Sequence, residues 1–371
     1  MKVLVTGDWH IGVSSFGIID ESGKNSRLQD FEDAINRSID IALNNRVDLY
    51  ICAGDIFHTN KPSVEEQRVF FRILQRLEAL ELKSRFIIGN HDFNSKIGSS
   101  HALKLFMDLI YEWRFVKIYD QTSWELFSEK DEQMPLLICF YPYHGEDPDL
   151  RNIGCNGPIS RSALVCHSHL EGAIVGAEPF EIKSDTATKF KHLPFNFIWA
   201  GHFHKPQKLS DIPLAIYPGS ICPVDFNERN DVKGVVLVNT LLDSYECAAI
   251  RIRDLYQIDL DWTVEKKFSF IENEVNGNIV KVKVRLLEEQ VQDFDEEQVK
   301  KSLLEAGAHS IASINFDVVK KEIRRNSEIR LDHNLIENVE KYLDMINVGP
   351  IRDKLLVEAK EIINESSCNR S

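Results

Sequence analysis

Short apolar segments alternate with longer segments of helical periodicity over the first two thirds of the chain. The apolar segments are rich in Val, Ile and Leu and hold few polar positions, which is typical of strands buried on both faces. We therefore expect strands at 3–6, 49–53, 86–88, 136–140, 163–166, 197–200, 214–217 and 235–238. Strands that alternate with helices in this way predict a layered α/β fold.

Two amphipathic helices are expected between the first three of these strands. The first carries apolar residues at spacings of three and four, namely Leu28, Phe31, Ile35, Ile39 and Leu43. The second follows Pro62, and Ser63 and Glu66 have the spacing of a capping box. Its predicted apolar stripe consists of Val64, Phe71, Leu74, Leu77 and Leu80.

The pattern changes near residue 253. Residues 279–286 alternate apolar and charged side chains, a helix is expected at 295–306, and a second strand at 311–319, so this region predicts a small α+β domain. Residues 331–365 carry two amphipathic helices separated by Gly349 and Pro350. Because two such helices alone cannot bury both apolar stripes, we expect them to dock on another surface. The expected parts are 1–252, 253–326 and 327–371.

The composition is typical of a globular protein, with 43% hydrophobic and 27% charged residues. No apolar run approaches the roughly 18 residues of a membrane span, so no membrane segment is expected. The first motif begins close to Met1, and the seven cysteines are scattered, several within apolar segments. We therefore expect no cleaved signal sequence, buried thiols and a cytoplasmic protein. The net charge of −14 argues against nucleic-acid binding by bulk attraction alone, although bound divalent ions would reverse the field locally.

Five short motifs that contain metal-ligand side chains directly follow predicted strands. They are Gly7-Asp8-Trp9-His10, Gly54-Asp55-Ile56-Phe57-His58, Gly89-Asn90-His91-Asp92, Cys166-His167-Ser168-His169 and Gly201-His202-Phe203-His204. Ligands of open α/β sheets bind outside the carboxyl ends of the strands, so these residues can converge on one cleft. Carboxylates, an amide and several imidazoles suit two adjacent divalent ions, with manganese, iron or zinc favoured over calcium. Such a pair of ions indicates phosphoester hydrolysis.

This ordered set of motifs resembles the calcineurin-like metallophosphoesterase superfamily. Within it, the chain is similar to the Mre-eleven/SbcD branch of double-strand-break-repair nucleases, and in size to the recombination endonuclease subunits of large bacteriophages. Gly54-Asp55-Ile56-Phe57-His58 and Tyr217-Pro218-Gly219-Ser220 carry the likeness to this branch. It covers residues 1–240 well and the remainder mainly by layout.

The resemblance implies a sandwich of β-sheets flanked by helices, with a small α+β capping domain and a C-terminal helical pair. It implies a homodimeric exo- and endonuclease acting at double-stranded DNA ends, with single-stranded DNA as a second substrate. It also implies an SMC-like ATPase partner of the Rad-fifty/SbcC type, bound through the C-terminal helices.

The resemblance further implies roles for the motif residues, with two divalent ions bound and Mn²⁺ expected. One ion would be held by Asp8, His10, Asp55 and His204, and the other by Asp55, Asn90, His167 and His202. His91 would protonate the leaving oxygen or stabilise the transition state, with Asp92 orienting it. His58 would help to position the phosphate or the DNA strand.

Several alternatives stay open at this point. His169 competes with His167 as a ligand, although His167 directly follows the strand. The basic cluster at 320–325 fits either a DNA contact or a solvated connector. The rival functions are a protein phosphatase, a small phosphodiesterase and an inactive scaffold of the same fold. Asp55 is followed by His58 and Thr59 rather than by the Asp-Arg pair of phosphatases, and no family ligand is missing, so both kinds of rival are weaker.

Overall fold

The computed structural model describes residues 1–21, 23–94, 100–109, 113–128, 135–145, 153, 161–175, 180–181, 187–319, 334–346 and 348–368. The chain forms two compact units. The larger unit consists of Met1–Arg285 with Gln292–Asp317, and the smaller of Leu286–Val291 with Val318–Ser371.

Two six-stranded sheets dominate the larger unit. The first has the order β14-β13-β1-β2-β3-β4 and the second β11-β12-β10-β7-β6-β5. Four neighbouring strands are parallel in each sheet, and the others pair antiparallel. The first sheet comprises β1 (Lys2–Thr6), β2 (Leu49–Cys52), β3 (Ser84–Ile87), β4 (Val116–Tyr119), β13 (Gly234–Asn239) and β14 (Ser244–Ala249). The second comprises β5 (Ser123–Phe127), β6 (Leu136–Tyr141), β7 (Arg161–His167), β10 (Phe197–Gly201), β11 (Gln207–Asp211) and β12 (Leu214–Tyr217).

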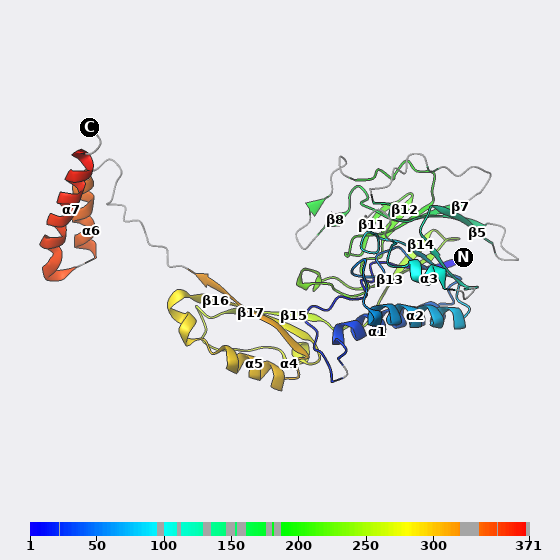
Figure 1. Ribbon diagram of the computed structural model, residues 1–371, viewed down its shortest axis with the longest axis horizontal. Coiled ribbons are helices and arrows are strands. Elements are labelled where there is room, and N and C mark those ends of the chain that lie inside the picture. The colour runs from blue at the N-terminus through cyan, green and yellow to red at the C-terminus, as the bar shows by residue number, and fades with distance from the viewer. Residues whose placement is uncertain are drawn as a thin grey trace. The chain divides into compact units, whose positions relative to one another are not determined.

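The two sheets pack face to face. Buried side chains from both, among them Val5, Ile51, Phe140 and Trp199, form the core between them. Helices α1 (Ser26–Asn44) and α2 (Val64–Ala79) lie side by side and cover the outer face of the first sheet (Figure 1). Aromatic residues around Phe190 pack on the outer face of the second sheet. The predicted layered sandwich of sheets flanked by helices is confirmed.

The apolar pattern did not predict four strands of these sheets, namely β4, β5, β11 and β14. These four are the edge strands, two in each sheet. All eight predicted strands are present, with ends shifted by up to two residues. An edge strand exposes one side to solvent and therefore needs no continuous apolar run. β14 illustrates this, because five of its six residues are exposed.

Helix α2 differs from its prediction in the buried face. The capping box is confirmed, because Ser63 and Glu66 exchange hydrogen bonds at 2.9 and 3.3 Å. Val64 and Leu80, predicted in the apolar stripe, are 70% and 39% exposed. They occupy the first helical position and the C-cap, so the buried face runs only through the middle turns. The buried residues there are Val69, Phe70, Ile73, Leu74 and Leu77.

A three-stranded sheet of order β15-β16-β17 follows in the sequence. Its elements are β15 (Leu255–Asp261), α4 (Glu272–Val275), β16 (Ile279–Leu287), α5 (Glu296–Glu305) and β17 (Ser310–Val319). Contacts tie this region to α1: Arg253 pairs with Asp30 at 3.1 Å, and His309 Nε2 lies 2.9 Å from Ser26 Oγ. The predicted boundary at residue 252 falls between β14 and β15 and stays a prediction.

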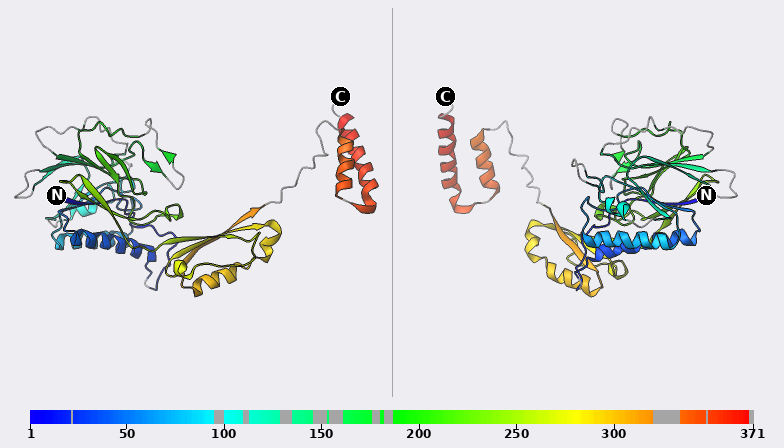
Figure 2. Two further views of the ribbon diagram at one scale, coloured as in Figure 1. Left: turned by 180° about the vertical axis from the view of Figure 1, so that it is seen from behind. Right: turned by 45° about the vertical axis from the view of Figure 1, so that its right-hand side comes forward.

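Helices α6 (Leu335–Met345) and α7 (Arg352–Cys368) form a side-by-side pair in the smaller unit (Figure 2). Salt bridges Lys360–Glu340 and Arg352–Asp344 join them. The basic cluster at 320–325 and the predicted boundary at 326 lie outside the described residues. Throughout the described part of the chain, no helix has the length and apolar character to cross a membrane.

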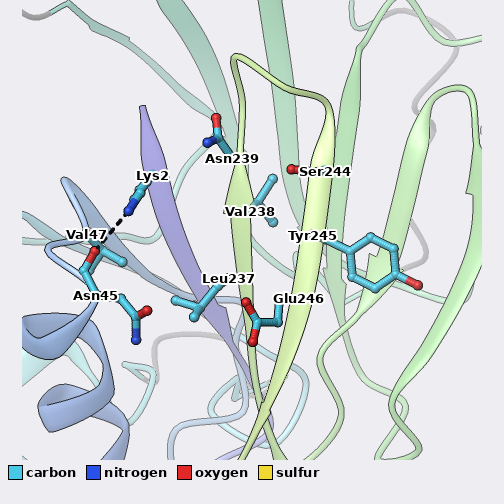
Figure 3. Close-up of a pocket in the computed structure, with 9 residues that line it drawn as sticks. All are labelled: Lys2, Asn45, Val47, Leu237, Val238, Asn239, Ser244, Tyr245 and Glu246. Atoms are coloured by element: carbon cyan, nitrogen blue, oxygen red, sulfur yellow. Dashed lines mark hydrogen bonds between the residues drawn. The ribbon is translucent and has the colours of Figure 1, made fainter.

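A surface pocket of about 260 Å³ lies between the start of β1 and the β13–β14 hairpin (Figure 3). Its lining includes Lys2, Asn45, Leu237, Tyr245 and Glu246. Lys2 begins β1, whereas the first metal-ligand motif follows Thr6 at the other end of that strand. The pocket is therefore remote from the motifs and forms no part of the candidate site.

Candidate metal centre

The five motifs lie at the carboxyl ends of β1, β2 and β3 in the first sheet and of β7 and β10 in the second. Backbone bonds tie the turns together, because Asp8 N–H donates to Gly54 O and His10 N–H to Asp55 O, both at 3.0 Å. Across the two sheets, His202 N–H donates to an oxygen of the Asp8 carboxylate at 2.9 Å. The motifs of both sheets therefore converge on one place.

The turns that carry these residues have an unusual backbone. The φ angle is 49° at Asp8, 46° at His10, 50° at Asp55 and 110° at His202. Positive φ is uncommon for residues with a side chain, although Asp and His tolerate it better than most, and it costs on the order of 1–3 kcal/mol at each position. Four such residues in one cluster indicate a site whose geometry serves function rather than stability.

Glycines allow the motifs to approach so closely. A Cβ added to Gly89 would lie 2.1 Å from Asp55 Oδ1, and one added to Gly201 would lie 2.1 Å from Ala53 O and 2.9 Å from His167 Nδ1. Neither glycine has a positive φ, so steric space rather than backbone conformation requires it. These two motifs thus combine a predicted ligand with the space that lets it reach its neighbours.

One group of ligand atoms comes from Asp8, His10 and His204, which lie within 4.8 Å of one another. The Nε2 atoms of His10 and His204 are 2.9 Å apart. The Asp55 carboxylate lies beside them, 3.7 Å from His10 Nε2. The four residues of the first expected shell are therefore adjacent.

The second group is built around His167 and Asn90. His167 Nε2 lies 2.9 Å from Asn90 Oδ1 and 3.4 Å from Asp55 Oδ2. His202 Nδ1 lies 2.9 Å from the same amide oxygen. Asp55 thus neighbours both His10 and His167, the position that a bridging carboxylate requires.

The hydrogen bonds show that the centre fits cations. His167 Nδ1 is 2.8 Å from Ala53 O, which can only accept, so this nitrogen carries a proton. In the neutral ring Nε2 is then a lone pair that faces the oxygens of Asn90 and Asp55, and all three atoms are acceptors. Metal–nitrogen distances of roughly 2.1 Å place two ring nitrogens that bind one ion at right angles about 3 Å apart. The Nε2 atoms of His10 and His204 have this separation. These converging oxygen and nitrogen atoms, each able to offer a lone pair, suit two divalent ions.

Electrostatics lead to the same conclusion. Burial raises the pKa of Asp8 to about 6, against the opposing effects of His167 and His204. Burial also raises the pKa of Asp55, but the imidazole of His167 outweighs it and holds the pKa below its usual range. Burial lowers the pKa of His167, whereas Asp55 reverses this and raises it to about 9. The buried carboxylates thus favour positive charge at this position, which bound cations would supply.

His91 and His58 lie beside the acceptor groups. His91 N–H donates to Asp55 Oδ1 at 2.8 Å, and His91 Nδ1 lies 2.7 Å from His58 O, to which it donates. The rings of His58 and His91 stack at 5.6 Å with planes inclined by 22°. Together with His10 they form a further group of imidazoles whose potential ligand atoms lie within 4.8 Å of one another. The two histidines therefore line the same centre as the predicted ligands.

Asp92 differs from the expected arrangement, in which it orients His91. Its carboxylate instead accepts hydrogen bonds from the backbone N–H groups of Ile56, Phe57 and Gly89 at 2.8–3.1 Å. The His91 ring is held by the carbonyl of His58. Asp92 is fully buried, and these three amides satisfy its carboxylate oxygens. The carboxylate thereby joins the turns after β2 and β3.

Three further residues contact the ligands. His169 Nε2 lies 2.7 Å from His202 Nε2, so His169 neighbours a predicted ligand. Glu228, in the 3₁₀ turn Phe226–Glu228, places Oε1 2.7 Å from His204 Nδ1, and Lys233 Nζ lies 2.7 Å from its Oε2. Sequence analysis missed Glu228 and Lys233, because neither belongs to a motif that follows a strand.

Comparison with known proteins gives consistent results. The family model "Calcineurin-like phosphoesterase" matches residues 1–206. The "DNA double-strand break repair protein Mre11" of Thermoplasma acidophilum is 28% identical over 67% of this chain and 64% of its own length. The "Exonuclease subunit 1" of Enterobacteria phage T4 is 26% identical over 65% of each chain. One of the subunits of the nuclease SbcCD of Escherichia coli K12 is 23% identical over 66% of this chain and 67% of its own.

The likeness to the first two relatives spans slightly less than two thirds of their length. The family model, in contrast, covers more than half of this chain and contains all five motifs. The predicted family is therefore confirmed: the chain belongs to the calcineurin-like phosphoesterases.

Proposed function

We propose that this protein is a two-metal-dependent DNA nuclease that hydrolyses phosphodiester bonds at DNA ends, as one component of a recombination and repair complex. The observation that carries the proposal is the convergence of carboxylate, amide and imidazole acceptors around Asp55. The names of the three relatives, which describe a break-repair protein and two nuclease components, support DNA as the substrate.

Seven residues would hold the two ions. Asp8, His10, Asp55 and His204 form one shell, and Asp55, Asn90, His167 and His202 the other, with Asp55 shared. When bound, two divalent ions neutralise phosphoryl oxygens and lower the pKa of an attacking water. The four imidazoles favour Mn²⁺ among the hard, oxygen-preferring ions.

His91 is the proposed catalytic acid. Its Nδ1 donates to the carbonyl of His58, so in the protonated ring Nε2 is the nitrogen free to give a proton to the leaving oxygen. The bond from His91 N–H to Asp55 holds this residue against the shared carboxylate. His58, stacked on His91, would position the phosphate or the DNA strand. Asp92 supports both through the turn backbones.

The C-terminal helices carry the proposed contact with an SMC-like ATPase. Large apolar side chains on α6, α7 and the turn between them are 44–66% exposed: Leu335, Tyr342, Met345, Ile346, Ile351, Val357 and Ile362. Exposed apolar side chains of this size can pack against a partner surface. Two relatives are named as subunits, which supports a complex. We also propose that the protein forms a homodimer.

A nuclease assay tests the function. The purified chain is expected to degrade linear double-stranded DNA with Mn²⁺ and only weakly with Mg²⁺, and blunt, overhanging and circular substrates would separate exo- from endonuclease activity. A strong preference for para-nitrophenyl phosphate over DNA would instead indicate a small phosphodiesterase or a phosphatase. No hydrolysis of either substrate, with two ions bound, would indicate an inactive scaffold.

A further inference from the structure

Glu228 occupies an enclosed position behind the ligand His204. The exposed fraction of its side chain is 11%, and that of the Lys233 side chain is zero. Oε1 lies 2.7 Å from His204 Nδ1, whereas Oε2 accepts from Lys233 Nζ at 2.7 Å and from Ser220 Oγ at 3.0 Å. The turn that presents Glu228 begins at Asp225, which caps Asn227 N–H at 2.6 Å. Every element of this arrangement holds the carboxylate against the ring.

The contact determines which nitrogen of His204 carries a proton. An ionised carboxylate only accepts, so His204 Nδ1 must donate to Glu228. In the neutral ring Nε2, the atom that faces His10 Nε2 at 2.9 Å, then carries a lone pair. Without such a partner, a neutral histidine exchanges freely between its two tautomers, and only one of them can bind an ion through Nε2.

Lys233 keeps the carboxylate in this role. Its ammonium group also donates to His204 O and to Ser220 Oγ, each at 2.9 Å. The lysine therefore joins the side-chain partner of His204 to the backbone of the same histidine. A second carboxylate, Asp231, lies 3.5 Å from Lys233 Nζ and provides a natural comparison.

We propose that Glu228 is a positioning residue that fixes the tautomer and the ring orientation of His204, and so strengthens one of the two metal sites selectively. The inference rests on the proposed function, because it assigns His204 to a metal ion. The other shell depends on different partners, the carbonyl of Ala53 for His167 and the ring of His169 for His202. Loss of Glu228 should therefore weaken one ion and spare the other.

Substitution by glutamine gives a sharp test. Lys233 can only donate, so the amide oxygen of Glu228→Gln is expected to turn toward it and to place the NH₂ group against His204 Nδ1. This reverses the favoured tautomer and puts a hydrogen on Nε2. The double variant Glu228→Gln/Lys233→Met frees the amide to turn its oxygen toward the ring, and should restore much of the binding.

The experiment is a Mn²⁺ titration followed by electron paramagnetic resonance, with ¹⁵N-histidine NMR of the metal-free protein to report the tautomer of His204. We expect wild type to bind two ions, Glu228→Gln to bind one of them roughly 10–100-fold more weakly, and the double variant to recover. The NMR signature should move from an Nδ1–H to an Nε2–H ring in Glu228→Gln. Asp231→Asn, which also removes a partner of Lys233, should change neither measurement.

Two results would count against the inference in different ways. Wild-type binding of both ions and an unchanged tautomer in Glu228→Gln would overturn the role of Glu228 and leave the proposed nuclease intact. A wild-type chain that binds no Mn²⁺ would overturn the proposed function together with the inference. The thermal midpoint without metal shows whether Glu228→Gln still folds. If it does not, the same two measurements on Glu228→Ala decide the question, because a water in place of the carboxylate can donate as well as accept and does not fix the tautomer.

Discussion

His10 and His204 face each other through Nε2 atoms 2.9 Å apart, although 194 residues separate them in the chain. One residue follows β1 in the first sheet and the other follows β10 in the second. The contact therefore exists only when both sheets are packed. Metal binding at this point would stabilise the sandwich as well as build the site, because an ion that binds only the folded chain adds its binding free energy to folding.

Replacing His91 should remove catalysis and leave the metals in place. His91→Asn is expected to lower DNA hydrolysis by roughly 100-fold or more, the usual contribution of general acid catalysis. Mn²⁺ binding should persist, since the ring is held by the His58 carbonyl and contributes no proposed ligand. Single-turnover cleavage and Mn²⁺ titration measure the two effects. His192→Asn, at an exposed position, is the control, and equal activity of both variants would remove His91 from the mechanism.

Gly89 supplies no ligand, but we expect it to be essential for metal binding. The Cβ of Gly89→Ala would lie 2.1 Å from Asp55 Oδ1, so the shared carboxylate must move and binding of both ions is expected to weaken. Gly7→Ala is a matched control beside Asp8, because its Cβ would meet only ordinary contacts at 3.6 Å or more. Calorimetric titration with Mn²⁺ measures the difference. Normal binding by Gly89→Ala would show that Asp55 does not need its present position.

An ion pair between Arg85 on β3 and Glu125 on β5 joins the two sheets. We expect acid to lower the stability of the protein by protonating Glu125. Two hydrogen bonds of 2.7 Å link the groups. Burial raises the pKa of Glu125, but the bonds from Arg85 and Tyr119 outweigh it and hold the pKa at about 2, below the ordinary 4.5. Between these two pKa values the unfolded chain binds more protons than the folded chain. The contribution of the pair to the free energy of unfolding is therefore fully present above about pH 4.5. It is lost as the pH falls toward 2.

Thermal unfolding of the metal-free protein at pH 5 and pH 3 checks this expectation. The midpoint of wild type should drop more between the two values than that of Glu125→Gln, which has no carboxyl group to protonate. Glu65→Gln is the control, because Glu65 forms an exposed pair with Arg68 and should behave like wild type. An identical drop in wild type and Glu125→Gln would contradict the assignment.

Removal of the C-terminal helices should abolish binding of the ATPase and leave DNA hydrolysis intact. A chain that ends at Arg330 is expected to keep Mn²⁺ binding and DNA hydrolysis, because all proposed ligands precede residue 205. It should no longer co-purify with the ATPase, since the exposed apolar side chains of α6 and α7 are gone. Val357→Asp tests the same surface in the full chain, with Glu358→Gln as its neighbouring control. Co-purification of the shortened chain would place the contact elsewhere.

Much of the fold could be predicted from the apolar pattern because its strands are buried on both faces. A strand such as β10 is apolar at every position, and such a run can be identified without knowing its neighbours. The edge strands could not be found in this way. In β11, for example, Lys208 and Asp211 make their hydrogen bond at the surface, so the composition resembles that of a loop.

The sequence by itself determined which candidate ligands occur and in what order, because each motif lies at the carboxyl end of a strand and parallel strands bring these ends to one edge. Only the tertiary structure decided how those residues are held. Glu228 reaches His204 from 24 residues away, and Asp92 accepts from three backbone amides, whereas the carbonyl of His58 holds the His91 ring. Such partners depend on side-chain directions and on the packing of distant turns, which no local spacing in the sequence encodes.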